Sequence, residues 1–441
     1  AQIICSRTMF RLASTMITPS MILTLRKECR HYDLIHVHHP DPMAALALYC
    51  SGYKGKVVLH WHSDVLKQRL LLKLYKPLQD WLIRRADRIV CTTPVMKEES
   101  DYLQEVQDKT IVIPIGIEPL EVKMNSVKVV RKQYKGKKIV FSLGRLVEYK
   151  GYPYLIEAAK YLPDNYVVVI GGEGPLWDDL NRQVIESGLQ KKVVLLGFIA
   201  NEQRQAYYGA CDVYCMSSIL KTEAFGIVQI EAMSCGKPVV ATNIGGSGVS
   251  WVNKHGYSGL NVEPRNAKAL AEAIVAVTEE KETYARYCEQ ATSRYWKTFT
   301  QNRMLDACAQ LYDELLNGDN QKQMSTTVNA SEMIPFACDS NVDSDIVSAR
   351  LCVKAKLKLR EVGEQYLLVD SQSSDVDFTR VFEMNKTAAW MWTKASELGT
   401  FTASQLVELM TEVFDADSER IYAGVLRQLH YWKENGLLNV A

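Results

Sequence analysis

Residues 222–233 of this chain read Thr-Glu-Ala-Phe-Gly-Ile-Val-Gln-Ile-Glu-Ala-Met, and this stretch carries more information about the fold than any other. An apolar run, residues 213–216, precedes it. Small residues follow, and then the buried-strand pattern of residues 239–242. The order predicts a strand, a polar loop, a helix, a turn and a second strand, which is the repeating unit of an α/β fold with a parallel sheet.

The helix in this stretch is expected to begin near Gly226. Its unpaired N–H groups and the positive end of its dipole then point into the loop, where a phosphate can sit. Glu223 is placed at the mouth of that anion site, and Glu231, about two turns along the helix, is within reach of the ribose of a bound nucleotide. The alternative is a surface helix that carries two acids, and two glutamates at this spacing would by themselves favour it.

Two cations follow an earlier strand. Residues 139–143 form a strand pattern that ends at Gly144, and Arg145 and Lys150 come next. Both cations therefore lie at the carboxyl edge of the predicted sheet, which is where ligands bind in open α/β folds. Arg offers a planar fork and Lys a point charge, and this combination suits a diphosphate.

Two further strands run into glycines. Residues 166–170 lead into the glycine-rich turn 171–175, and residues 193–196 lead to Gly197, with Phe198 and Ile199 directly after it. Glycine at a strand end lets the backbone approach a ligand closely. The repeated strand-to-glycine pattern predicts that several loops meet around one ligand.

Taken together, these segments resemble the family-4 type of retaining nucleotide-sugar glycosyltransferases, which have the GT-B fold of two Rossmann-like domains with parallel sheets. The resemblance covers about residues 1–317. The matching positions are Gly144-Arg145, Lys150-Gly151, residues 171–175, Gly197-Phe198, residues 223–226, 231–233 and 236–240, Gly245-Gly246 and residues 259–262.

The resemblance implies a role for each of these positions. Arg145 and Lys150 would hold the donor diphosphate and stabilise charge on the departing nucleotide. Glu223 would contact hydroxyls of the donor sugar, and Glu231 would bind the ribose. The other donor-binding positions would act through their backbone or face the base; they are Gly144, Gly172, Phe198, Ile199, Ala224, Phe225, Gly226 and Ile227.

The implied reaction is transfer of a sugar from a nucleoside-diphosphate-sugar to an acceptor hydroxyl with retention at the anomeric carbon, in bacterial glycan biosynthesis. The enzyme would be of the hexosyltransferase type (EC 2.4), with a glycan or a lipid-linked saccharide as acceptor. No cofactor and no metal are expected, because Arg, Lys and a helix end supply positive charge at the diphosphate.

The N-terminal part adds strand patterns with histidines at their ends. His62 follows the pattern of residues 56–61, and in the resemblance it matches a catalytic histidine facing the donor sugar. His60 and His62 lie on one face of a strand, so a metal pair is an alternative, but no third ligand stands at a telling distance in the sequence. His36, His38 and His39 either line the acceptor cleft or are structural.

The chain begins without a methionine, at Ala1. The family opens with a strand, a glycine-rich loop and a long helix, and none of these is recognisable here. We expect the chain to be a fragment of a longer protein, with residues 3–5 as a later strand of the first domain and an N-terminal sheet that lacks its central strand.

Composition narrows the class of protein. The 441 residues predict two or three domains. A net charge of +1 gives no case for nucleic acid. The 11 cysteines are odd in number and include no Cys-x-x-Cys, which favours a reducing compartment and a cytoplasmic protein. No apolar run approaches the roughly 20 residues of a membrane span.

Residues 66–88 combine leucines with seven Lys or Arg residues in a helical pattern. A basic amphipathic segment of this kind can touch an anionic membrane, where a lipid-linked acceptor would lie. The protein would then sit peripherally on the inner face of the membrane. An ordinary surface helix whose leucines face the sheet is an equal alternative.

Composition changes after residue 317. Residues 318–349 are rich in Ser, Thr, Asn, Gln and Asp and are predicted to be a linker. A β-hairpin over 357–362 and 365–370, a strand at 380–384 and three helices follow. This tail resembles the PqqD-like peptide-binding domains, also called RiPP recognition elements. The matching segments are residues 382–392, 414–417 and 435–438, and Asn385 is the expected N-cap of the first helix.

The predicted organisation is an acceptor domain at residues 1–117, a donor domain at 118–317, the linker, and a small α+β winged-helix-like domain at 350–441. Two functions compete. The first is the glycosyltransferase described above. The second is a peptide-binding or scaffold protein that uses the PqqD-like tail, including a tail that guides glycosylation of a peptide. Intact Arg145, Lys150 and Glu223 favour the enzyme, while the donor sugar, the base and the acceptor stay open.

Overall fold

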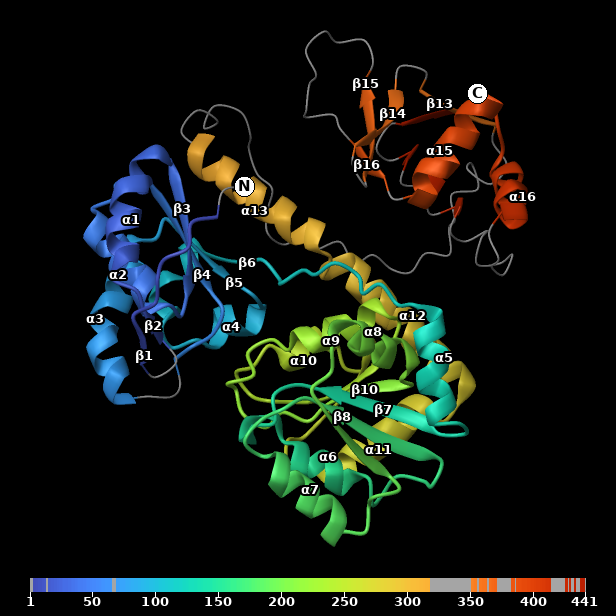
Figure 1. The fold of residues 1–441 in the computed structure, drawn as a ribbon. Helices are drawn as coiled ribbons and strands as arrows, with labels where there is room; N and C mark the ends of the chain where they lie inside the picture. The colour runs from blue at the N-terminus through green and yellow to red at the C-terminus, as the bar shows by residue number, and fades with distance from the viewer. Residues whose placement is uncertain are drawn as a thin grey trace. The chain divides into compact units, whose positions relative to one another are not determined.

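The computed structural model describes residues 3–12, 15–65, 69–317, 350–354, 357–362, 365–370, 382–384, 386–413, 425–426, 428–429, 432–433 and 437–440. The chain forms two compact units, Ala1–Ser325 and Thr326–Ala441, which are described separately below. The first unit contains two parallel sheets with helices on their faces, and the second is a small α+β unit (Figure 1).

The first sheet has the strand order β3-β4-β5-β6, and all its strands are parallel. The strands are β3 (Leu34–His39), β4 (Lys56–Trp61), β5 (Arg88–Cys91) and β6 (Thr110–Val112). The connecting segments are α2 (Pro42–Ser51), α3 (Arg69–Arg85), α4 (Pro94–Glu99) and the 3₁₀ helix η2 (Gln104–Lys109). Asp41 starts α2 by accepting backbone N–H bonds from Met43 and Ala44 at 2.9 and 3.1 Å, and Gly52 ends it at φ 67°.

The second sheet has the order β12-β11-β10-β7-β8-β9 and is also parallel. Its strands are β7 (Lys138–Leu143), β8 (Tyr166–Gly171), β9 (Val193–Gly197), β10 (Val213–Met216), β11 (Val239–Thr242) and β12 (Gly259–Val262). The sheet order reverses between β7 and β10, so this edge is a topological switch point, where α/β folds bind ligands.

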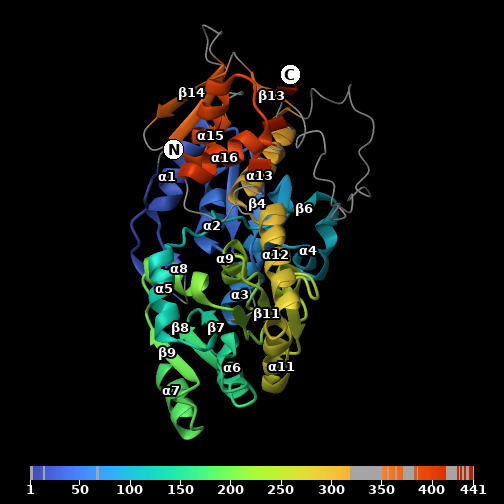
Figure 2. The same ribbon diagram turned by 90° about the vertical axis from the view of Figure 1, so that its right-hand side faces the viewer.

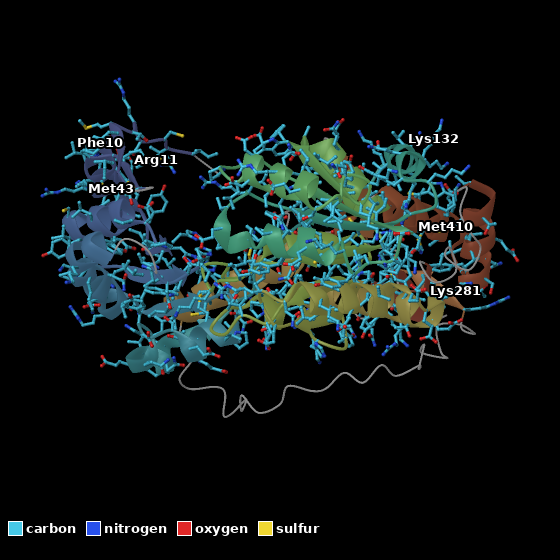
Figure 3. The ribbon with its side chains drawn as sticks, turned by 90° about the horizontal axis from the view of Figure 1, so that it is seen from below. Phe10, Arg11, Met43, Lys132, Lys281 and Met410 are labelled. Carbon is cyan, nitrogen blue, oxygen red and sulfur yellow. The ribbon has the colours of Figure 1, made fainter. Side chains whose placement is uncertain are left out.

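Helices cover both faces of the second sheet (Figure 1). They are α5 (Met124–Gln133), α6 (Tyr152–Ala158), α7 (Trp177–Glu186), α8 (Asn201–Ala210), α9 (Ile227–Ser234), α10 (Val249–Val252), α11 (Ala267–Thr278) and α12 (Lys281–Thr298). Figure 3 shows Lys132 of α5 and Lys281 of α12 at the outer surface, where both are exposed. The doubly wound arrangement confirms the predicted Rossmann-like fold class.

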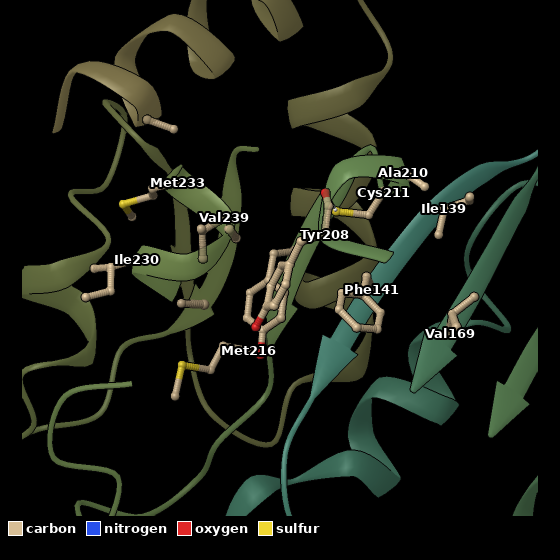
Figure 4. Packing of buried hydrophobic residues seen from close by; sticks show 14 of the residues in the cluster. Ile139, Phe141, Val169, Tyr208, Ala210, Cys211, Met216, Ile230, Met233 and Val239 are labelled. Carbon is tan, nitrogen blue, oxygen red and sulfur yellow. Dashed lines mark hydrogen bonds between the residues drawn. The ribbon is translucent and has the colours of Figure 1, made fainter. Parts of the chain in front are cut away.

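The core under the second sheet is rich in aromatic residues. Figure 4 shows Phe141 of β7 beside Tyr208 of α8, with Met216 of β10 nearby. The Phe141 and Tyr208 rings meet edge to face with centroids 5.2 Å apart. Removing such buried rings from water is the main favourable term for this half of the unit.

The last helix of the first unit, α13 (Gln301–Asn317), packs on the first sheet. Leu311 is 3% exposed and lies against Val58 of β4 and Val90 of β5. In the turned view of Figure 2, α12 and α13 follow one another, with α13 beside β4. Helix α13 therefore returns the chain to the first sheet.

One local expectation at the start of the chain needs correction. Residues 3–5 form no strand. Instead β1 (Phe10–Leu12) and β2 (Thr15–Ile17) pair antiparallel, and α1 (Ser20–Glu28) follows. The reason is that Ile3 and Ile4 are 86% and 49% exposed and therefore have no apolar layer to pack on.

The helix predicted in the basic segment is α3. Its second half turns Leu82 and Ile83 inward, at 1% and 6% exposure, while Leu74 is 80% exposed. Lys76 is paired with Asp80 at 2.7 Å. The inward leucines fit the surface-helix interpretation for this half. Among the described residues, no helix has both the length and the apolar character needed to cross a bilayer.

The second unit contains the predicted hairpin. Strands β14 (Leu357–Val362) and β15 (Gln365–Asp370) pair antiparallel, and β16 (Phe382–Met384) joins β15. The other described elements are β13 (Leu351–Val353), α15 (Lys386–Leu398), α16 (Ala403–Val413) and β17 (Leu438–Val440). The Trp392 and Trp432 rings meet edge to face at 5.1 Å in its core. The linker 318–349, Asn385, residues 414–417 and residues 435–436 of the last matching segment lie outside the described residues.

Candidate functional site

At the carboxyl edge of the second sheet, two glycines allow the backbones of neighbouring loops to lie in contact. Gly144 follows β7 at φ 159°, and Gly172 follows β8 at φ 130°. A Cβ atom on Gly172 would lie 2.0 Å from the carbonyl oxygen of Gly144. Since only glycine allows this approach, the loops after β7 and β8 are held side by side. The predicted strand-to-glycine pattern therefore has a direct structural reason.

Lys150 ends a short 3₁₀ turn, η3 (Glu148–Lys150), and its side chain returns over Gly144. A Cβ atom on Gly144 would lie 3.4 Å from the Lys150 Nζ. Gly151 follows at φ 65°, where a Cβ would collide with the carbonyl oxygen of Ser217 at 2.1 Å. The sequence Lys150-Gly151 thus fixes a cation directly above the end of β7.

Lys150 forms an ion pair with Glu223. Its Nζ lies 2.5 Å from Oε2 of Glu223, and the two side chains are only 12% and 11% exposed. Ser218 Oγ donates a second hydrogen bond to the same carboxylate oxygen at 3.0 Å. Ser247 Oγ donates to the backbone carbonyl of Glu223. The pair is shielded from water and held on both sides, so its charges act strongly on each other and on any ligand between them.

Arg145 is placed differently. It lies directly after Gly144, and its side chain is exposed. Within the part of the chain that the structure describes, it forms no ion pair. A guanidinium that is held at the sheet edge but not neutralised is available to an incoming anion.

Helix α9 begins where the sequence predicted. Gly226 is its N-cap at φ 79°, and a Cβ there would meet the Met216 side chain at 2.7 Å. Ile227, the first helical residue, is 42% exposed. Phe225, in contrast, is 4% exposed and meets Phe299 edge to face at 6.0 Å. Of the four predicted donor-binding positions Ala224–Ile227, Phe225 therefore contributes a core side chain, and only its backbone is suited to a ligand.

Glu231 lies on α9 and is 7% exposed. Its Oε1 accepts a hydrogen bond from Arg204 at 3.0 Å, and its Oε2 accepts one from the hydroxyl of Tyr208 at 2.7 Å. Both partners belong to α8 and were missed by the sequence reasoning. Their i, i+4 spacing, which puts them on one face of a helix, was the available signal. Each carboxylate oxygen keeps a further lone pair for another donor.

The two positions predicted to face the base lie after β9. Phe198 is 72% exposed. Ile199 is half-buried, and its side chain occupies the space beside Gly171, where a Cβ would meet Ile199 Cδ1 at 2.2 Å. The pair therefore presents one free aromatic ring and one packed aliphatic side chain near the ends of β8 and β9.

The first sheet carries a different group at its strand ends, the histidine cluster His36, His38, His60 and His62. Parallel pairing sets His38 opposite His60. The rings of His60 and His62 stack with centroids 4.2 Å apart, and His38 Nδ1 lies 2.7 Å from His62 Nε2. His39 points to the other face, where it stacks on Trp61 at 3.7 Å. His39 is 1% exposed and structural, and the structure gives it no place in the cluster.

Burial makes the histidine cluster neutral. Burial, followed by repulsion from neighbouring histidines, lowers the pKa of His36 and of His62 to about 4. Burial, followed by the charge of His62, lowers the pKa of His60 to about 2. His38 shifts in the same direction for the same first reason. At neutral pH the rings are therefore uncharged, so each can donate a hydrogen bond through one nitrogen and accept one through the other. His62 is then in the unprotonated form that a general base requires.

The sequence offered no third ligand for a metal pair at His60 and His62. The structure brings His36, His38 and His60 together, with one nitrogen of each within 4.8 Å of the others. This group contains His60 but not His62, and its other two members, His36 and His38, come from the neighbouring strand β3.

Comparison with known families agrees with this geometry. Residues 125–294 match the family described as "Glycosyl transferases group 1", and residues 4–119 match "Glycosyltransferase Family 4". Residues 365–438 match "Coenzyme PQQ synthesis protein D (PqqD)". The three matches follow the order of the two sheets and the second unit.

Among curated relatives, O-antigen chain mannosyltransferase C of Escherichia coli is 32% identical over 71% of this chain and 84% of its own length. D-rhamnosyltransferase WbpZ of Pseudomonas aeruginosa is 32% identical over 66% and 76%. Among solved structures, Anabaena HepE in complex with UDP and glucose has a TM-score of 0.57 at 23% identity, covering 66% of this chain and 80% of that one. Sucrose-phosphate synthase from Thermosynechococcus elongatus also has a TM-score of 0.57, at 22% identity over 71% and 83%.

The two structural likenesses support the fold, and the curated relatives supply the activity class. The parallel sheets, the strand-end glycines and the paired charges at Lys150 and Glu223 are all present in the matched region. The chain belongs to the family-4 glycosyltransferases of the GT-B fold, and it carries a PqqD domain after them.

Proposed function

We propose that this chain transfers a sugar from a nucleoside-diphosphate-sugar to an acceptor hydroxyl with retention at the anomeric carbon. The observation that carries the proposal is the shielded Lys150–Glu223 pair, which lies against Gly144 at the carboxyl edge of the second sheet. A cation and an anion at one point suit a donor that is anionic at its diphosphate and rich in hydroxyls at its sugar.

Donor binding would exchange partners within this pair. A diphosphate oxygen takes the place of the Glu223 carboxylate on Lys150 Nζ, and Arg145 contributes its free fork from the exposed side. The released Glu223 carboxylate then accepts hydrogen bonds from hydroxyls of the sugar. The N–H groups at the start of α9, near Ile227, add fixed positive dipoles. Glu231, oriented by Arg204 and Tyr208, binds the ribose.

The transfer step breaks the bond between the anomeric carbon and the diphosphate oxygen, and the electron pair leaves with the diphosphate. Lys150, Arg145 and the α9 N–H groups stabilise the charge that develops there. The acceptor oxygen bonds to the same face of the oxocarbenium-like centre, and its proton passes to the leaving phosphate oxygen. His62, neutral at pH 7, would face the donor sugar through the ring edge that does not contact His38.

The relatives narrow the donor and the acceptor. One curated relative is named an O-antigen chain mannosyltransferase and another a D-rhamnosyltransferase, and a structural neighbour was solved with UDP and glucose. We therefore propose a hexose or deoxyhexose donor and a glycan or lipid-linked acceptor. A lipid-linked acceptor would bring the enzyme to the inner face of the membrane, and the basic helix α3 would be the element that contacts the membrane. Transfer would need no cofactor.

The test of retention is an NMR assignment of the product. The chain is incubated with UDP-, GDP-, TDP- and ADP-sugars of known anomeric configuration and an acceptor glycan. The expected product has the anomeric configuration of the donor. A product of inverted configuration would contradict the mechanism while leaving glycosyl transfer intact.

A second candidate function concerns the PqqD domain. The three-stranded sheet β14-β15-β16 ends at β14 and β16, and an extended peptide can add to such an edge by main-chain hydrogen bonds. We propose that this unit binds a peptide, as a scaffold or as a way to present a peptide acceptor. Hydrogen exchange on the full chain tests it. A bound peptide should slow exchange at an edge strand, and unchanged exchange with every candidate acceptor peptide would contradict it.

A further inference from the structure

We propose that the histidine cluster is a binding site for a divalent transition metal ion of the zinc class, with His36, His38 and His60 as ligands and with His62 and Tyr312 orienting the ligand rings. One nitrogen from each of the three ligands lies within 4.8 Å of the others. The inference concerns the first sheet and does not depend on the transfer reaction proposed above.

Strand geometry brings the three rings together. His36 and His38 alternate along β3, so both point to one face of the sheet. The parallel register sets His38 beside His60 of β4, and ring centroids lie 5.0 Å apart for His36–His38 and 5.2 Å apart for His38–His60. Zinc–nitrogen bonds of about 2.0–2.1 Å place tetrahedral ligand atoms roughly 3.4 Å apart. An ion would therefore draw the rings together by side-chain rotation alone.

The nitrogens that would bind the ion lack other partners. Nε2 of His36 and both ring nitrogens of His60 are buried without a hydrogen-bond partner, and His60 is 4% exposed. Leaving a buried polar nitrogen unpaired costs free energy, which a bound ion would recover.

The remaining ring nitrogens already have partners. Nδ1 of His36 lies 2.6 Å from the hydroxyl of Tyr312 on α13, and Nδ1 of His38 lies 2.7 Å from Nε2 of His62. Metal-bound histidines usually donate their second ring N–H to such a group, which fixes the tautomer and the orientation of the ring. Ligation through Nε2 of His36 and His38 would put the proton on Nδ1, from which it can be donated to Tyr312 and to His62.

Space for a fourth ligand lies alongside. A cavity of about 580 Å³ is lined by His36, His38 and His62 together with residues of α1 and α2. Three neutral imidazoles and an open position are the donor set of sites that keep a water on zinc. The proposed ion would therefore have three protein ligands and one exchangeable water.

The experiment uses the full chain carrying a tag without histidine, stripped with a chelator and titrated with Co²⁺ and Zn²⁺. We expect one equivalent of Co²⁺ to give the strong visible bands of four-coordinate cobalt, and Zn²⁺ to displace it. The ligand variants are His38→Ala, which removes an exposed side chain, and His60→Gln. Each should weaken Zn²⁺ binding more than a hundredfold. Tyr312→Phe should weaken it about tenfold with unchanged stoichiometry.

The matched control is His31→Ala, which removes an exposed histidine of the same domain outside the cluster. It should bind Zn²⁺ like the wild type. Circular dichroism of each metal-free variant checks folding, and if His60→Gln fails to fold, His38→Ala decides. Cobalt without four-coordinate bands, or Zn²⁺ affinity that is equal in wild type and His38→Ala, would overturn the proposal.

Discussion

The two main sheets of the first unit are both parallel, but they arrange polar side chains near their strand ends in opposite ways. The second sheet sets charge against charge, with Lys150 on Glu223 and Arg204 on Glu231. The first sheet sets neutral rings against one another: His36, His38, His60 and His62 contact each other and Tyr312. In both places the groups are mostly buried, so the difference lies in how their desolvation is compensated.

The difference indicates what each edge can accept. A buried ion pair is satisfied internally but can exchange one partner for a ligand of the same sign, so the Lys150–Glu223 site suits an anion that replaces the carboxylate. A group of neutral imidazoles with unpaired nitrogens has lone pairs to give and no charge to exchange, so it suits a cation. We therefore propose that the first unit combines an anion site at its second sheet with a cation site at its first sheet.

The largest expected effect on turnover comes from removing the cation of the Lys150–Glu223 pair. Lys150→Ala removes the ammonium that would stabilise the departing diphosphate and should lower kcat about 100- to 1000-fold. Steady-state transfer assays measure it, with the exposed Lys160→Ala as the control, which should turn over like the wild type. Equal turnover in Lys150→Ala and wild type would remove the proposed role of this lysine.

Removing the negative charge of Glu223 is expected to lower sugar transfer less than removing Lys150 does. Glu223→Gln leaves the Lys150 ammonium shielded from water without its counter-ion, so the metal-free, ligand-free protein should lose stability. A nucleoside diphosphate would restore the missing negative charge. We therefore expect it to raise Tm more in Glu223→Gln than in wild type, while sugar transfer falls at least tenfold.

The control for this prediction is Glu272→Gln, which changes an exposed glutamate of α11. Its Tm shift on adding the diphosphate should match that of the wild type. A diphosphate-induced shift that is smaller in Glu223→Gln than in wild type would mean that the phosphate does not take the place of the carboxylate.

The smallest effect is expected at Arg204, which acts through Glu231. Arg204→Ala frees the Glu231 carboxylate from one of its two partners and should weaken nucleotide binding several-fold, by about 1 kcal/mol. Arg204→Lys should restore part of the loss. Calorimetry with ribo- and 2′-deoxyribonucleotides shows whether Arg204 orients Glu231 toward the ribose or only supports the fold. The wild type should bind the ribonucleotide more tightly than the deoxyribonucleotide, and Arg204→Ala should show a smaller difference. An unchanged preference would leave Arg204 as a structural residue.

The sequence predicted the backbone features at the carboxyl edge of the second sheet well, because the signals for them are local. Gly144, Gly172 and Gly226 sit where close backbone contact or positive φ requires them, and each follows a strand or precedes a helix in the sequence itself. The start of α9 and the hairpin β14–β15 agree with expectation to within a residue. Short-range stereochemistry determines such features, so a single sequence is enough to predict them.

Contacts between distant elements could not be predicted in the same way. Arg204 and Tyr208 reach Glu231 across 27 and 23 residues, and His36 reaches Tyr312 across 276. The metal-ligand arrangement depends on the register between β3 and β4, and one residue of slip would separate His38 from His60. The burial of Phe225 likewise depends on Phe299, far along the chain.

The central claim is that the Lys150–Glu223 pair is the diphosphate site, and isothermal titration calorimetry tests it most directly. UDP, GDP, TDP and ADP are titrated into wild type and Lys150→Ala, and the corresponding monophosphate is titrated for the base that binds. The account predicts that Lys150→Ala loses at least tenfold in affinity for the diphosphate and much less for the monophosphate. Equal losses for both nucleotides, or no loss for either, would contradict it.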